Sequence, residues 1–123
     1  MVATQELFDR IIDHFIKQGH RAMNEAEDCI YRGPNGDMCA IGCLISDEAY
    51  TPDLETKPAF AKSVQAALKA SGIETEGRVK FFEEMQFAHD HATTVLALRD
   101  RLWQAADELG LDATKVAYIT NWE

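Results

Sequence analysis

Cys39 is the residue from which chemistry would most readily start in this sequence. It follows a glycine-rich turn, and if it opens a short helix, the helix N-terminus would stabilise its thiolate. His89 and His91 could then supply a base, with Asp90 between them as a nearby acid. This combination is typical of a cysteine-dependent hydrolase or transferase, although the sequence after His91 contains no convincing strand to hold the base. The enzyme is kept as an alternative hypothesis.

Zinc binding is the second chemistry that these residue types allow. Structural zinc sites usually contain a tight C-x2-C pair, whereas the three cysteines here are spaced C-x9-C-x3-C. Free cysteines commonly serve as small buried apolar residues. We therefore expect no metal and no cofactor, and keep a structural zinc domain only as an alternative. Its Cys3His ligands would be Cys29, Cys39 and Cys43 with His20, His89 or His91.

A third interpretation treats the same part of the chain as a rigid binding surface. The segment 32–37, RGPNGD, favours a turn, because proline presets φ and Asn-Gly favours positive φ. Arg32 can bind carbonyls or a carboxylate such as Asp47 through its planar guanidinium. Tyr31 offers an apolar ring with a polar tip. The residues predicted to bind a partner are Tyr31, Arg32, Asn35 and Asp47.

Helices must position these residues, because apolar side chains recur at helical spacing along most of the chain. The first helix is predicted from Thr4, as its N-cap, to Gln18, with Gly19 as the left-handed residue at its end. A later helix is predicted to use Pro58 in its first turn and to bury Phe60. The three later helices are expected at 58–71, from about 76–80 to about 89, and at 95–109.

The chain around the cysteines is less regular. Residues 29–33 favour a short strand, and residues 38–45 favour either the return strand of a hairpin or a short buried helix, which periodicity cannot separate. We predict a single domain, residues 1–123, of the α+β class but mainly α, in which about four helices pack around one short β-hairpin at residues 29–45. Apolar residues of the tail should pack on the core or on a second subunit, so a homodimer stays open: Val116, Tyr118, Ile119 and Trp122.

Composition limits the class of partner. The chain has 21 acidic and 12 basic residues and a formal net charge of -9. Such a protein repels phosphate backbones, and no basic patch is evident, so we expect no direct contact with nucleic acid. No apolar stretch approaches the ~20 residues of a membrane helix, and the first residues do not have the pattern of a signal peptide. An odd number of cysteines, 3, fits reduced thiols in a cytosol.

The motif C-x-Y-R-G-P-x-G-x-x-C-A-x-G-x-L-I-x-D-E-x-Y-x-P-x-x-E spans Cys29 to Glu55. It resembles small uncharacterised proteins encoded by bacteriophages, prophages and other mobile elements. Ser46 stands where relatives would be expected to have proline. The resemblance implies a phage-like setting, and small size and acidity fit it. We therefore expect a protein of the bacterial host cytosol that binds a host protein, with inhibition of a defence system as one concrete form.

Overall fold

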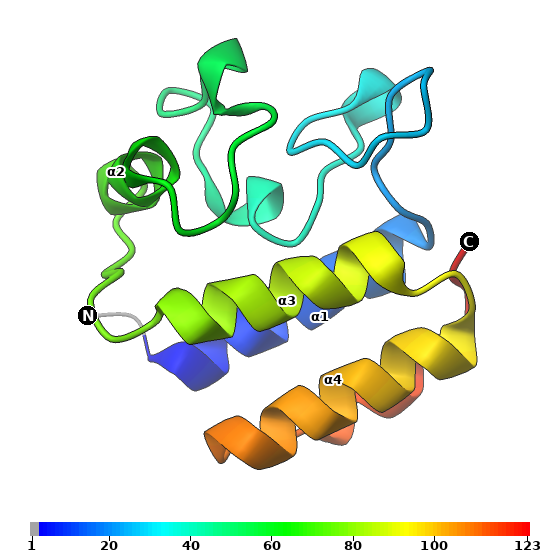
Figure 1. The fold of residues 1–123 in the computed structure, drawn as a ribbon. Helices are drawn as coiled ribbons and strands as arrows, with labels where there is room; N and C mark the ends of the chain where they lie inside the picture. Colours follow the sequence, from blue (N-terminus) through cyan, green and yellow to red (C-terminus); the bar gives the residue numbers. More distant parts are fainter. Residues whose placement is uncertain (1–2) are drawn as a thin grey trace.

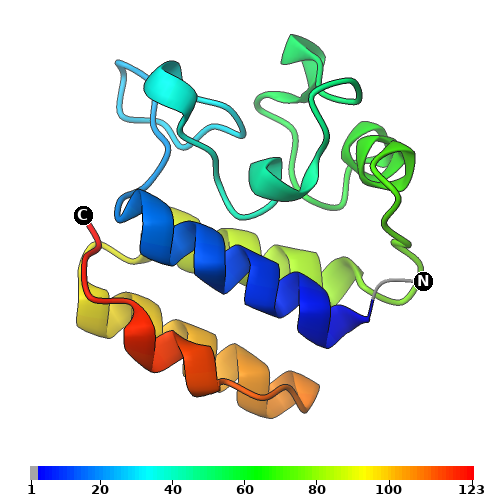
Figure 2. The ribbon, with the colours of Figure 1, turned by 180° about the vertical axis from the view of Figure 1, so that it is seen from behind.

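Three long helices pack together and are called the helical layer below. The computed structural model describes residues 3–123. Both views show α1 (Thr4–Gln18) and α3 (Val79–His91) at the same level, one in front of the other, with α4 (Val95–Leu109) beneath them (Figures 1 and 2). The bounds predicted for α1 are confirmed, and Gly19 has the expected positive φ of 74°. The N-cap is Ala3, so the prediction that Thr4 caps the helix is wrong. The buried residues of α1 repeat at helical spacing: Leu7, Phe8, Ile11, Ile12 and Phe15.

The C-terminal tail packs against the helical layer. A 3₁₀ helix, Thr114–Tyr118, packs against α1 and α4. Trp122 is buried, and its indole Nε1 donates to the carbonyl oxygen of Ala92 at 2.8 Å. The guanidinium of Arg99 on α4 holds the carbonyl of Ile119. Packing of the tail on the core is confirmed for Val116, Ile119 and Trp122, whereas Tyr118 is exposed.

Residues 20–78 form the second layer, called the loop layer below, which lies over α1 and α3 on the side away from α4 (Figures 1 and 2). It contains the short helix α2 (Lys62–Ala70) and three single 3₁₀ turns: Pro34–Gly36, Gly42–Leu44 and Pro52–Leu54. The helix α2 begins after Pro58, so Pro58 is not in its first turn. Phe60 consequently lies outside the helix with 59% of its surface exposed, which contradicts the prediction that it is buried.

The predicted β-hairpin at residues 29–45 is wrong. No strand occurs in residues 3–123, and the protein is essentially all-α. A single antiparallel bridge joins Arg32 to Met38. Beyond it the chain coils into the 3₁₀ turn Gly42–Leu44, which packs on α1. The open choice for residues 38–45 is thereby resolved in favour of a short helical turn.

In the loop layer, side chains form the hydrogen bonds that a neighbouring strand would otherwise form. The backbone N–H groups of Tyr31 and Arg32 donate to the carboxylate of Glu55, at 2.9 and 3.2 Å. The backbone N–H of Met38 donates to the side chain of Gln18, whose amide in turn donates to the Met38 carbonyl. Because these groups are already satisfied, the turn needs no further strand pairing.

Gly42 lets two parts of this layer touch. A Cβ at this position would lie 2.0 Å from the carbonyl oxygen of Tyr31, far inside the closest approach of a side-chain carbon to a non-bonded oxygen. The absence of a side chain therefore permits the close approach of the two backbones. No helix in residues 3–123 is both long enough and apolar enough to cross a membrane.

Candidate functional site

A groove runs between α3 and the loop segment that carries Pro58. Its inner part is a cavity of about 280 Å³, and its outer part is a cavity of about 260 Å³. The two cavities share four lining residues, so they adjoin on the surface, and together they are called the Pro58 groove below. The shared residues are Pro58, Ala59, Gln86 and Asp90.

Aromatic side chains form the outer rim of the Pro58 groove. Phe60 and Phe87 are 59% and 41% exposed. The ring of His91 stacks on Phe87 with 4.2 Å between the ring centroids, and the guanidinium carbon of Arg101 lies 4.2 Å from the centroid of the Phe87 ring. The Phe87 ring is therefore held in place by its neighbours while part of it faces solvent.

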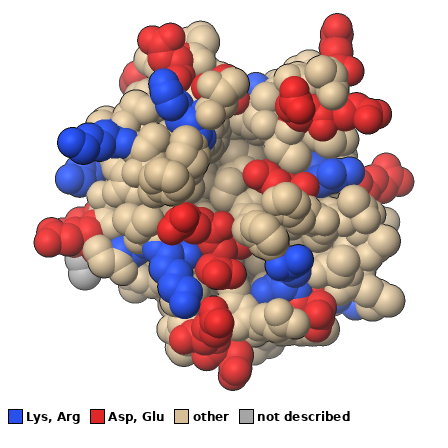
Figure 3. Space-filling view, in the orientation of Figure 1, with Lys and Arg blue, Asp and Glu red and all other residues tan. Residues whose placement is uncertain are grey.

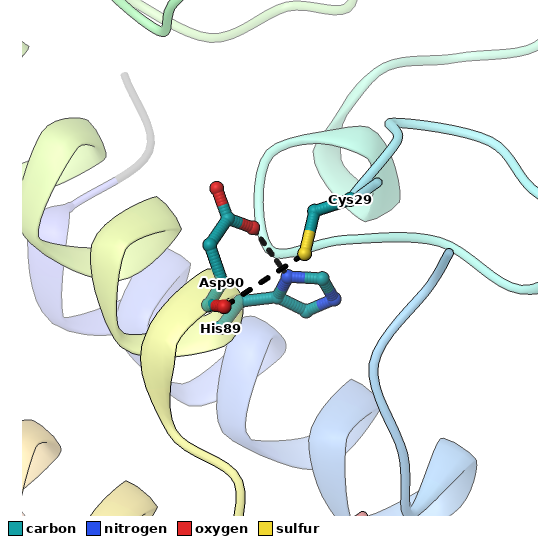
Figure 4. Close-up of side chains that lie close together, drawn as sticks. All are labelled: Cys29, His89 and Asp90. Carbon is teal, nitrogen blue, oxygen red and sulfur yellow. Dashed lines mark hydrogen bonds and ion pairs between the residues drawn. The ribbon is translucent and has the colours of Figure 1, made fainter. Parts of the chain in front are cut away.

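His89 is fully buried, and it lies beside Cys29 and Asp90, two residues that line the inner cavity (Figure 4). The ring nitrogen Nε2 of His89 accepts the backbone N–H of Ala22 at 3.0 Å, so it carries no proton. The other nitrogen, Nδ1, must then carry the proton and donates it to Oδ1 of Asp90 at 2.7 Å. His89 is thus a neutral ring with both nitrogens engaged, and it ties α3 to the loop layer.

Cys29 lies beside this pair, and its thiol donates to the backbone carbonyl of Asp90 at 3.8 Å. Burial, together with the nearby Asp90 carboxylate, raises the pKa of Cys29 to about 11. A thiol with such a pKa is a poor nucleophile at neutral pH. His89 has no free nitrogen to remove its proton, so the resemblance to a Cys-His-Asp catalytic set is one of proximity only.

The same three residues do not fit a zinc ion. Their ligand atoms lie within 4.8 Å of one another. A metal on Nδ1 of His89 would force the proton onto Nε2, where it would face the N–H of Ala22. The other two cysteines are not part of this cluster, so the Cys3His arrangement is not assembled by the described residues.

Comparisons with protein-family models, with curated proteins and with solved structures returned no match. The groove is therefore interpreted from its own geometry.

Cys39, the nucleophile predicted for an enzyme, is fully buried. Its sulfur accepts the backbone N–H of Gly42 at 3.2 Å. Burial raises the pKa of its thiol strongly, and burial likewise raises the pKa of Cys43 to about 12. Among residues 3–123 no hydrogen bond joins Cys39 to His89 or His91, and His91 lies instead at the rim of the Pro58 groove.

The predicted contact of Arg32 with a carboxylate and a carbonyl is confirmed. Its guanidinium donates to Asp47 at 2.6 Å and to the carbonyl of Ile45 at 2.5 Å, and it lies 5.0 Å from the centroid of the Tyr50 ring. These contacts are all within the protein, so they fix the conformation of the loop layer. Asn35 is exposed at the tip of its turn with a φ of 63°, the positive value that the Asn-Gly pair predicts.

The four residues predicted to bind a partner are thus placed at different sites. Tyr31 forms a wall of the Pro58 groove, and its buried hydroxyl donates to the carbonyl of Lys57. Arg32 and Asp47 form an ion pair, and Asn35 lies on a separate turn. Sequence reasoning missed Gln86, and it named Cys29 only as a possible zinc ligand. Cys29 and Asp90 are 61 positions apart, and no local pattern connects them.

Glu55 is a second residue that sequence reasoning missed. Besides two backbone N–H groups, its carboxylate accepts the Tyr50 hydroxyl at 2.6 Å. Its place as the last residue of the Cys29–Glu55 motif is the signal that could have found it. The next residue, Thr56, has a φ of 69°, which is unusual for a β-branched side chain, and it lines the groove.

Charges of both signs surround this part of the surface. On the face drawn in Figure 3, acidic side chains gather over α3 with basic side chains between them. Asp90 and Glu55 line the inner cavity, and Glu83 lines the outer one. The mixture gives no continuous acidic stripe on this face of residues 3–123, but it leaves the groove with several carboxylates.

Proposed function

We propose that this chain is a binding protein that contacts a partner protein through the Pro58 groove. The observation that carries the proposal is the pair of exposed phenylalanines, Phe60 and Phe87, at the rim of a depression. Large aromatic side chains beside a pocket are the groups that supply most of the binding energy in protein interfaces. Arginine and aromatic residues are also enriched there, as in the stack of Arg101 on Phe87.

Two further features support binding in preference to catalysis. The thiols of Cys29 and Cys43 have pKa values raised to about 11 and about 12. The imidazole of His89 uses both nitrogens inside the protein. A cysteine enzyme needs a thiolate and a base within reach of its proton, and these groups supply neither function.

The proposed setting follows from the Cys29–Glu55 motif and its resemblance to proteins of phages and mobile elements. On that basis the partner is a host protein in the bacterial cytosol, and one concrete outcome is inhibition of a defence system. The acidity of the chain favours a protein partner over nucleic acid.

The test is affinity capture from a bacterial lysate with paired surface variants. Phe60→Ser with Phe87→Ser removes the aromatic rim, and Leu96→Ser with Tyr118→Ser removes two side chains of similar or greater exposure, 75% and 66%, on α4 and the tail. We expect a stoichiometric partner that is lost with the first pair and retained with the second. Capture of no stoichiometric partner, or equal loss with both pairs, would contradict the proposal.

A further inference from the structure

We propose that the inner cavity of the Pro58 groove receives a lysine or arginine side chain of the partner, which pairs with the free carboxylate oxygen of Asp90. The inference rests on the proposed function, because it names the chemistry of the partner at that site. Its support is that one carboxylate oxygen at the cavity is free while neighbouring hydrogen-bonding groups are already engaged.

Asp90 uses only one of its two oxygens inside the protein. Its Oδ1 accepts from Nδ1 of His89 at 2.7 Å and from Nε2 of Gln86 at 2.8 Å. Its Oδ2 has no hydrogen-bond partner among residues 3–123, and Figure 4 shows that this oxygen points away from His89. Since His89 is neutral, the negative charge of Asp90 is not cancelled by its nearest neighbour.

The donors of Tyr31 and Gln86, which line the same cavity, are already engaged. The N–H of Tyr31 donates to Glu55, and the Tyr31 hydroxyl donates to the carbonyl of Lys57. The Gln86 amide is fixed at both ends, because it donates to Asp90 and accepts the N–H of Ile41. A ligand that enters the cavity therefore meets a free carboxylate oxygen, which a cationic donor satisfies best.

The shape of the site favours an organic cation over a metal ion. Hard metal cations need six or more oxygen ligands, whereas the carboxylate of Glu55 is already bound to two backbone N–H groups and the Tyr50 hydroxyl. The cavity of about 280 Å³ is lined by apolar surface of Ile30, Pro58 and Ala59 beside its polar groups. Such a wall suits the aliphatic stem of lysine or arginine, which stays in apolar contact while the charged end is bound.

The aromatic rim indicates which type of partner residue should lie next to that basic residue. Phe60 and Phe87 line the outer cavity, which adjoins the inner one at Pro58 and Ala59. An apolar side chain adjacent to the basic residue would cover the exposed rings. The partner segment is thus expected to combine one basic and one apolar residue.

Lys57 offers an internal check, because this exposed residue lines the inner cavity and is itself cationic. Its positive charge repels a cationic ligand in the cavity. Removing it with Lys57→Gln should strengthen the binding of a cationic ligand about twofold, the size expected of a single exposed charge.

The experiment is an NMR titration of the full chain with small probes. N-acetyl-arginine-N-methylamide should shift the signals of Gln86, Asp90 and Thr56, and N-acetyl-norleucine-N-methylamide should not.

Asp90→Asn keeps an oxygen for Nδ1 of His89 but removes the charge, and it should weaken arginine binding about five- to tenfold, the loss expected for one charge-assisted hydrogen bond. Asp107→Asn on α4 is the matched control and should leave binding unchanged. Equal binding of both probes, or equal affinity in Asp90→Asn and the native protein, overturns the inference.

A second probe ties the cavity to the rim. N-acetyl-leucyl-arginine-N-methylamide should bind more tightly than N-acetyl-glycyl-arginine-N-methylamide, and Phe60→Ser with Phe87→Ser should abolish the difference. If capture of a protein partner depends on the phenylalanines but arginine binding does not depend on Asp90, this inference fails and the proposed function stands. If arginine binding depends on Asp90 but capture ignores the phenylalanines, the proposed function fails and the cation site stands.

Discussion

The two layers of the molecule satisfy their backbone groups in different ways. In the helical layer, α1, α3 and α4 use hydrogen bonds between neighbouring turns, and their apolar residues recur at a fixed spacing. In the loop layer, the backbone groups of Tyr31, Arg32 and Met38 are bound by the side chains of Glu55 and Gln18. The first arrangement is encoded locally, and the second depends on residues that are far apart in the sequence.

The largest effect is expected where the loop layer is most tightly built, at Gly42. Gly42→Ala places a methyl group 2.0 Å from the Tyr31 carbonyl oxygen, so the backbone must move. We expect a loss of about 4 kcal/mol or more in the free energy of unfolding, measured by urea denaturation. If the loss is below ~1 kcal/mol, the close approach is not required for the fold.

A matched glycine separates crowding from backbone conformation. Gly77 has a φ of 75° and no atom within 4 Å of a Cβ built on it. Gly77→Ala should cost about 1–2 kcal/mol, the strain of a left-handed residue. A loss as large as that of Gly42→Ala would show that the contact with Tyr31 does not distinguish the two sites.

The same contrast decided how much of the fold could be predicted. Helix bounds at Gln18 and Leu109 followed from periodicity and from Gly19 and Gly110, which take positive φ at the helix ends. The prediction of a β-hairpin was wrong because the backbone N–H of Tyr31, in the first predicted strand, donates to the side chain of Glu55 and not to a second strand. Glu55 has no periodic relation to Tyr31 in the sequence. Of the residues that line the Pro58 groove, Tyr31 and His91 were named from the sequence, but their contacts were not. The Arg32–Asp47 contact, which lies outside the groove, was anticipated because charge complementarity is visible in sequence.

Glu55 tests whether one side chain really replaces a strand. Glu55→Ala leaves the N–H groups of Tyr31 and Arg32 without their acceptor, and the Tyr50 hydroxyl loses its partner as well. We expect a loss of about 3 kcal/mol in the free energy of unfolding, because each unsatisfied polar group costs about 1–3 kcal/mol. Glu55→Gln keeps one oxygen and should lose roughly half as much. Equal stability of the native protein and Glu55→Ala in urea would remove Glu55 from the framework of the loop layer.

The cysteines probe the loop layer in a second way, because it contains all 3 of them. With a pKa of about 11 in place of the ordinary 9.0, Cys29 should react with iodoacetamide roughly a hundredfold more slowly at neutral pH than in the urea-unfolded chain. The measurement is mass spectrometry of alkylated peptides over time. A Cys29 or Cys39 that reacts as fast in the folded protein as in urea would restore the enzyme hypothesis.

The smallest effect concerns His14, the residue through which α1 reaches across to the loop layer. Its Nε2–H donates to the Met38 carbonyl at 2.7 Å, beside the bond from Gln18. Burial lowers the pKa of His14 below its ordinary 6.5, against the opposing influence of the Met38 hydrogen bond. The unfolded chain therefore takes up a proton at a higher pH than the folded protein does, so the contribution of His14 to stability is constant above about pH 6.5 and falls as the solution is acidified below it.

His14→Gln retains an N–H donor for Met38 but cannot be protonated, so its urea midpoint should fall less between pH 7 and pH 5 than that of the native protein. If His14→Gln and the native protein lose stability in parallel, the joint between α1 and the loop layer does not depend on the protonation of His14.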